Sequence, residues 1–221
     1  MDRFGCDAVL FDLDGVLVDS TPSVERVWRE WANLHGLDVA DILAVAHGRR
    51  TAETISLVAP HLDAAAEAKR LETREIEDTA AVLPIEGAAA LLETLPSERW
   101  AVVTSGTRAL AHARLRACGL PIPQTFVGAE DVQRGKPDPE CYLRGARLLG
   151  VRPDRCVVVE DAPSGVAAGR AAGATVIAVT TTHRAPELSD ANAVAETVGS
   201  LQVRLDTNTG GFALELVIDR E

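Results

Sequence analysis

Short apolar segments alternate with helical segments through the second half of the chain. The apolar segments are 100–103, 125–127, 156–159 and 175–179. The segments 107–118, 138–149 and 164–172 between them have helical spacing, and each is followed by a glycine that would end a helix. A further apolar segment, 8–13, precedes the turn Asp14–Gly15. Strands that alternate with helices in this way form parallel sheets with right-handed crossovers, so we expect an α/β fold.

Residues 18–83 interrupt this pattern, because they contain several helical segments and lack a convincing strand. Apolar side chains recur at helical spacing near its start: Val24, Val27, Trp28, Trp31 and Leu34. Further helices are expected over 40–46, 51–59 and 63–82. We therefore expect a core of residues 1–17 and 84–221 with an inserted helical cap of residues 18–83. The insert follows the first strand, at the sheet edge where ligands bind, so it should lie over the site as a lid.

The last part of the chain has the pattern of a hairpin. Residues 201–205 and 212–217 flank the turn-forming sequence Asn208-Thr209-Gly210-Gly211. We expect this hairpin to extend the sheet or to cover its edge.

The charge and cysteine content restrict the partners and the compartment. The chain of 221 residues has 33 acidic and 22 basic side chains, a formal net charge of −11. Such a surface repels nucleic acid and anionic membranes. There is no long apolar run or signal sequence, and the four cysteines are dispersed. We expect a cytoplasmic protein without a nucleic-acid or membrane partner, either a monomer or a small homo-oligomer.

Polar residues follow or flank the predicted strands: Asp12, Asp14, Thr104, Ser105, Gly106, Lys136, Glu160 and Asp161. Taken singly, each has a simpler explanation. The acids and hydroxyls are common in turns and helix caps, and a lysine before a proline is usually a solvated loop residue. In a parallel sheet, however, the carboxyl ends of the strands lie at one edge. The joint pattern therefore favours a single site that is rich in carboxylates and holds one lysine.

Four motifs in this set resemble those of a known family. They are Asp12-x-Asp14-Gly15-Val16, Val102-Val103-Thr104-Ser105, Lys136 in Gly-Lys-Pro-Asp-Pro, and Glu160-Asp161 in Val-Val-Val-Glu-Asp-Ala-Pro-Ser-Gly. In this order, with a helical insert between the first two, they resemble the haloacid dehalogenase superfamily of phosphotransferases. The resemblance covers about residues 7–182. It implies a Rossmann-like parallel sheet with an inserted α-helical cap.

The resemblance also implies a role for each motif residue. Asp12 would attack phosphorus and form an aspartyl-phosphate, and Asp14 would serve as general acid and then general base. Asp12, the backbone carbonyl of Asp14, and Asp161 would bind Mg2+, with Glu160 in the outer shell. The phosphoryl group would be bound by Thr104, Ser105 and Gly106. Lys136 would neutralise charge on the nucleophile and the phosphoryl group.

The segment His47-Gly48-Arg49-Arg50-Thr51 in the insert is the best candidate for recognising the rest of the substrate. His47, Arg49 and Arg50 would contact a small phosphorylated substrate, although a solvated loop with Thr51 as a helix cap is an alternative. This segment and those around Thr104 and Lys136 resemble a subgroup that includes glycerol-phosphate and 2-deoxyglucose-6-phosphate phosphatases. The resemblance implies a phosphatase of small sugar or polyol phosphates.

Three other functions are less favoured by the residues present. Related hexose-phosphate mutases have a histidine in the first cap helix, whereas this chain has Val24 there. Phosphonate-cleaving relatives need a cap lysine, and Lys69 lies in a helical charge pattern typical of a solvated residue. A non-catalytic binding domain would also keep the fold. Because the proposed site is itself acidic, we expect substrate binding to need the metal, with Arg49 and Arg50 adding positive charge.

Overall fold

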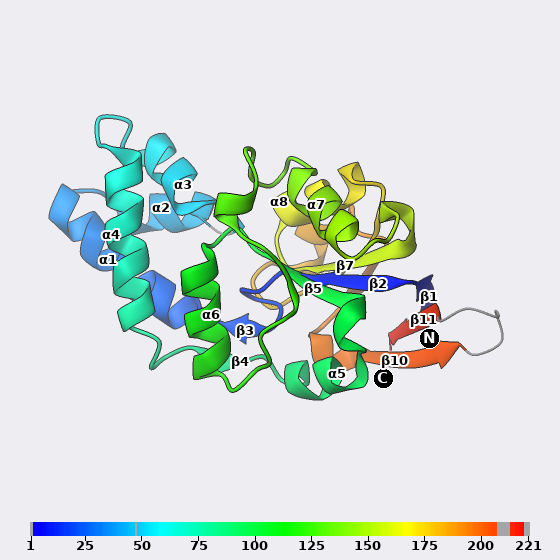
Figure 1. Cartoon of the computed structure of the whole chain (residues 1–221). Helices are drawn as coiled ribbons and strands as arrows, with labels where there is room; N and C mark the ends of the chain where they lie inside the picture. Colours follow the sequence, from blue (N-terminus) through cyan, green and yellow to red (C-terminus); the bar gives the residue numbers. More distant parts are fainter. Residues whose placement is uncertain (1, 47, 207–212, 219–221) are drawn as a thin grey trace.

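The computed structural model describes residues 2–46, 48–206 and 213–218. A six-stranded parallel sheet forms the centre of the molecule, and its strands β5, β2 and β7 lie side by side in Figure 1. The full strand order is β6-β5-β2-β7-β8-β9. Its strands are β2 (Ala8–Phe11), β5 (Trp100–Val103), β6 (Thr125–Val127), β7 (Cys156–Glu160), β8 (Thr175–Val179) and β9 (Ala193–Ala195). The expected α/β fold is confirmed; β9 was not predicted from the sequence.

Helices cover both faces of this sheet, which explains why its central strands are almost entirely apolar up to their carboxyl ends. Helices α5 (Ala88–Thr94) and α6 (Arg108–Ala117) pack on the face that carries Val9 and Phe11. Helices α7 (Glu140–Leu148) and α8 (Pro163–Ala171) pack on the face that carries Ala8 and Leu10. Short 3-10 helices complete the connections: η1 (Ser97–Arg99), η2 (Ala129–Asp131), η3 (Pro153–Arg155), η4 (Ala185–Leu188) and η5 (Val198–Ser200).

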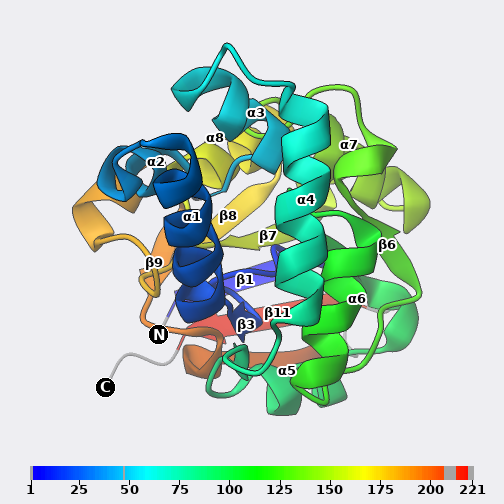
Figure 2. The same ribbon diagram turned by 90° about the vertical axis from the view of Figure 1, so that its left-hand side faces the viewer.

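The inserted cap consists of helices α1 (Thr21–His35), α2 (Val39–Ala46), α3 (Thr51–Val58) and α4 (Ala64–Glu77). It lies beyond one end of the sheet, with α1 and α4 in front in Figure 2. Its own small core includes Trp28, Trp31 and Ile55, so the middle of the predicted helical stripe is buried. Leu34 at the end of the stripe is exposed instead. Two short antiparallel strands, β3 (Val18–Asp19) and β4 (Leu83–Pro84), join it to the core.

Helix α4 is shorter than the expected 63–82, because Asp78 ends it and fixes the following chain against α1. The carbonyl of Asp78 accepts a hydrogen bond of 2.6 Å from the hydroxyl of Ser23, and its carboxylate pairs with Arg26. Interactions between helices distant in sequence therefore set this helix end.

The C-terminal strands β10 (Leu201–Asp206) and β11 (Ala213–Ile218) pair antiparallel, as a hairpin requires. Its predicted turn lies outside the described residues. Of the two roles expected for the hairpin, extension of the parallel sheet is wrong, since β11 pairs instead with β1 (Asp2–Cys6) in a separate three-stranded sheet. Leu201 and Leu216 on this sheet belong to the same apolar cluster as Leu91 of α5. The hairpin thus closes the core beside α5.

In the described part of the chain, no helix combines the length and apolar character that crossing a membrane requires.

Candidate active site

Asp12 lies where β2 ends, and its backbone amide donates to the carbonyl of Val159 on β7 at 3.0 Å. The chain then turns sharply at Gly15, whose φ of 76° is in the left-handed region. A Cβ at Gly15 would overlap the carboxylate of Asp161, so glycine is needed here for two reasons. The turn lets the first and last acidic motifs approach one another closely.

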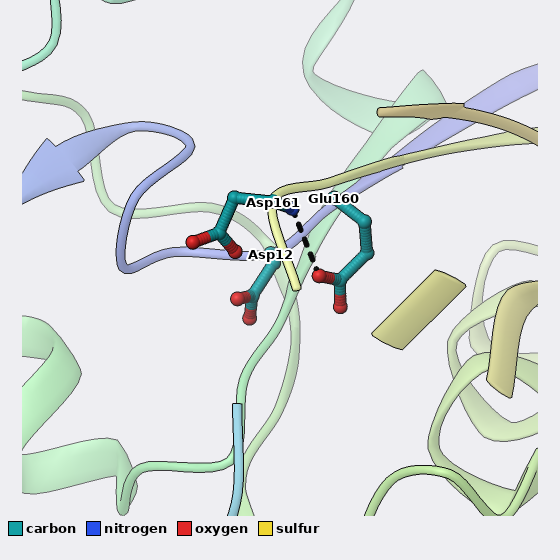
Figure 3. A group of neighbouring side chains, drawn as sticks. All are labelled: Asp12, Glu160 and Asp161. Carbon is teal, nitrogen blue, oxygen red and sulfur yellow. Dashed lines mark hydrogen bonds between the residues drawn. The ribbon is translucent and has the colours of Figure 1, made fainter. Parts of the chain in front are cut away.

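Asp12, Glu160 and Asp161 form a buried carboxylate cluster, with one oxygen of each within 4.8 Å of the others (Figure 3). Lys136 lies beside it: Nζ is 2.9 Å from Oδ1 of Asp12 and 2.6 Å from Oε1 of Glu160. Burial raises the pKa of Asp12 to about 7 and that of Asp161 well above its usual range. Burial alone would lower the pKa of Lys136, but the neighbouring carboxylates of Asp12 and Glu160 raise it overall.

Glu160 serves as the anchor of this cluster, because both of its carboxylate oxygens accept hydrogen bonds. Lys136 and the hydroxyl of Tyr142 each donate to Oε1 at 2.6 Å. The backbone amides of Asp161 and Ala162 donate to Oε2 at 3.0 and 3.2 Å. Sequence reasoning missed Tyr142, whose only signal is a hydroxyl on a buried helix face. The saturated carboxylate agrees with an outer-shell place for Glu160.

The carboxylates of Asp12 and Asp161 fit a divalent metal ion. Oδ1 of Asp12 is buried and accepts no hydrogen bond from any residue that the structure describes. Its contact with Lys136 is an ion pair without hydrogen-bond geometry. Oδ2 of Asp161 accepts a hydrogen bond from the hydroxyl of Thr182, a second residue that sequence reasoning missed. Closely spaced anionic oxygens of this kind are the ligands that hard divalent cations prefer.

Thr104, Ser105 and Gly106 form the loop between β5 and α6 and line the same cavity as Asp12. The hydroxyl of Thr104 accepts a hydrogen bond from the backbone amide of Gly106 at 3.1 Å. The hydroxyl of Ser105 donates to the carbonyl of Gly48 in the cap at 2.8 Å. Thr107, rather than Thr104 or Ser105, caps α6. The loop is therefore held by one hydrogen bond within itself and one to the cap.

The cavity lies between core and cap, and its cap-side lining includes Val24, Trp28, Arg49, Thr54 and Glu75. The structure thus brings the predicted residue Arg49 to the cavity. His47 lies outside the described residues.

Arg50 does not line this cavity. Its guanidinium instead donates to the carbonyl oxygens of Val132 at 2.9 Å and Gln133 at 3.2 Å. These carbonyls belong to the core loop that precedes Lys136. The structure therefore places Arg50 as a link between the cap and this loop.

Asp14 has partners that the sequence did not indicate. Its Oδ1 accepts hydrogen bonds from the hydroxyl of Ser20 and from Nη1 of Arg114, each at 2.7 Å. Arg114 lies on the buried face of α6 with Leu110 and Leu115. An arginine in such an apolar stripe is a signal for a buried partner, because a guanidinium is rarely buried alone.

Comparisons with known proteins agree with this site. Residues 6–173 match the family model for haloacid dehalogenase-like hydrolases. Hexitol phosphatase A of Escherichia coli (strain K12) is 45% identical over 208 residues, which cover 92% of this chain and 96% of that protein. Glycerol-1-phosphate phosphohydrolase 2 of Saccharomyces cerevisiae is 37% identical, covering 80% of this chain and 75% of that protein.

A solved structure of a hydrolase from Pseudomonas syringae shares the fold with a TM-score of 0.76 and 28% identity, covering 87% of this chain and 94% of that one. The fold and the carboxylate site define a hydrolase with an α/β core and an inserted helical cap. The chain belongs to the haloacid dehalogenase-like hydrolase family, as the four sequence motifs predicted.

Proposed function

We propose that this protein is a Mg2+-dependent phosphatase that hydrolyses small sugar or polyol phosphate monoesters through an aspartyl-phosphate. The observation that carries the proposal is Asp12, a buried carboxylate 2.9 Å from the ammonium of Lys136 and on the wall of a cavity between core and cap. In this proposal residues 1–17 and 84–221 carry the chemistry, and residues 18–83 select the substrate.

In the first step, a carboxylate oxygen of Asp12 attacks phosphorus, and the bond from phosphorus to the substrate oxygen breaks. Asp14 gives its proton to the leaving alkoxide and then accepts a proton from the water that hydrolyses the acyl phosphate. Thr104, with the backbone amide of Ser105, binds the phosphoryl oxygens, and Gly106 allows close approach. Lys136 offsets the negative charge that gathers on Asp12 and the phosphoryl group.

The carboxylates of Asp12 and Asp161 and the backbone carbonyl of Asp14 would hold Mg2+, which would offset the charge of the phosphoryl group. Glu160 keeps Lys136 in place rather than binding the ion directly, because its oxygens are occupied by four donors.

The cap-side lining supports a small polar substrate. Arg49 supplies positive charge there, and the hydroxyl of Thr54 is buried without a hydrogen-bond partner among the described residues. The names of the relatives point to hexitol and glycerol phosphates. Val24 at the cavity cannot transfer a proton, which disfavours the mutase alternative. The cysteines Cys6, Cys118, Cys141 and Cys156 are unbridged, which supports our proposal of a cytoplasmic enzyme.

A phosphate-release screen over polyol, sugar and nucleotide monophosphates, with and without Mg2+, tests the function. We expect turnover of hexitol, glycerol or hexose phosphates that needs Mg2+ and disappears in Asp12→Asn. Failure to hydrolyse any ester would contradict the proposal, and a clear nucleotide preference would contradict the substrate class. With β-glucose 1-phosphate and a trace of the bisphosphate, free phosphate supports the phosphatase and glucose 6-phosphate supports the mutase.

A further inference from the structure

Arg114 connects the cap to the site through two ion pairs. It lies on α6 of the core, and its side chain is 5% exposed. Nη1 is 2.7 Å from Oδ1 of Asp14, and Nη2 is 2.6 Å from Oε2 of Glu75 on cap helix α4. Glu75 is equally buried, whereas the side chain of Asp14 is 31% exposed. All three residues line the cavity, so the network runs from the cap to Asp14 along the cavity wall.

The geometry restricts the carboxylate of Asp14. Oδ1 accepts two hydrogen bonds, one from Arg114 and one from the hydroxyl of Ser20. Two donors on one oxygen fix the plane and the rotamer of the carboxyl group. A general acid must be held within hydrogen-bond reach of the oxygen that it protonates, so this restriction bears directly on catalysis.

Arginine suits this position for a specific reason. Its planar guanidinium presents two nitrogens in a fixed fork, and here each nitrogen binds a carboxylate from a different part of the fold. A lysine would have to contact both carboxylates from one nitrogen on a flexible stem, so it would not hold them in the same fixed geometry. If Glu75 moved away with the cap, Arg114 would lose its second partner and its orientation. The alignment of Asp14 then depends on the seating of α4 against α6.

We propose that Arg114 is a positioning residue that aligns Asp14 for proton transfer, and that Glu75 holds Arg114 in that orientation when the cap is seated. This inference rests on the proposed phosphatase function. It assigns a catalytic consequence to an interaction between cap and core, whereas the cap would otherwise act only on substrate selection.

Esters with different leaving groups provide the test. Glycerol 3-phosphate releases a strongly basic alkoxide and needs a general acid, whereas 2,4-dinitrophenyl phosphate releases a weakly basic phenolate and needs little protonation. In Arg114→Gln and Arg114→Lys, we expect kcat/KM for glycerol 3-phosphate to fall at least about 30-fold more than kcat/KM for the dinitrophenyl ester. Glu75→Gln should shift the same ratio about 5-fold.

Arg108→Gln is the matched control, because Arg108 is also on α6 but pairs with Asp131 away from the cavity. It should leave both esters within about 2-fold of the parent protein. In an Asp14→Asn background, the further change Arg114→Gln should lower kcat/KM little more, because the residue that Arg114 positions is already disabled.

Equal losses on the two esters, or a full additional loss in the Asp14→Asn background, would overturn the inference and leave Arg114 with a packing role only. If Arg114→Gln does not fold, Glu75→Gln and Arg114→Lys test the inference by the ratio of their kcat/KM losses on the two esters. Circular dichroism is the folding control. A parent protein that hydrolyses neither ester would instead contradict the proposed function.

Discussion

Nζ of Lys136 lies 2.6 Å from Oε1 of Glu160, and both side chains are buried. Glu160→Gln removes one of the two negative charges that face this ammonium and leaves the hydroxyl of Tyr142 with a poorer acceptor. We expect the free energy of unfolding to fall by about 3 kcal/mol, as when one partner of a buried ion pair is removed. Chemical denaturation measures this change. Tyr142→Phe, which removes one donor only, should cost about 1 kcal/mol; equal losses would contradict the anchoring role of Glu160.

Asp12→Asn should abolish turnover without weakening the metal-free fold. The carboxylate of Asp12 is buried beside Glu160 and Asp161, so a neutral amide relieves repulsion within the cluster. We expect a loss of at least about 1,000-fold in phosphate release. The melting temperature in chelator should be no lower than that of the parent protein. A drop of several degrees would show that the charge of Asp12 stabilises the fold.

Removal of the metal should weaken phosphate binding as well as stop turnover. Without a cation, the three carboxyl groups of Asp12, Glu160 and Asp161 face the single ammonium of Lys136, and each one that is ionised repels an incoming dianion. Titration calorimetry with inorganic phosphate, in chelator and then in excess Mg2+, should show affinity that returns with the ion. Phosphate affinity that is the same under both conditions would contradict this model of the site.

Glu75 should make the stability depend on pH. Burial raises its pKa from the ordinary value of 4.5 to about 7, although Arg114 opposes the shift. Between these values the folded protein binds more protons than the unfolded chain, so the contribution of Glu75 to stability falls as the pH rises through this range. We expect this contribution, up to about 3 kcal/mol, to be absent in Glu75→Gln. Unfolding free energies of both proteins measured from pH 4.5 to 7.5 test this, and curves of equal slope would refute it.

The sequence predicted the arrangement of the central motifs because a parallel sheet has a simple geometry. Asp12, Thr104 and Asp161 each follow an apolar strand, and strands of equal direction bring such residues to one edge. This needs only the strand pattern, so the clustering of these motif residues could be foreseen without knowledge of side-chain packing.

The remaining features depend on contacts that no local pattern encodes. Arg114 and Asp14 are separated by 100 positions, and their pairing follows from how α6 packs beside the turn after β2. Strand β1 has the mixed sequence Asp-Arg-Phe-Gly-Cys and gains its structure from pairing with β11. The sequence therefore did not predict this strand or its pairing with the hairpin. Arg50 has two neighbours in the core loop that only the closed arrangement of the cap reveals.

The two strands that carry the chain into and out of the cap lie side by side, with Val18 opposite Pro84 and Asp19 opposite Leu83. The ends of the inserted segment are therefore separated by one strand spacing, about 5 Å. A different helical segment with similarly close ends could replace this one without moving β2 or β5. The junction thus lets substrate range diversify by exchange of one contiguous segment, while the residues that act on phosphorus stay where the parallel sheet places them.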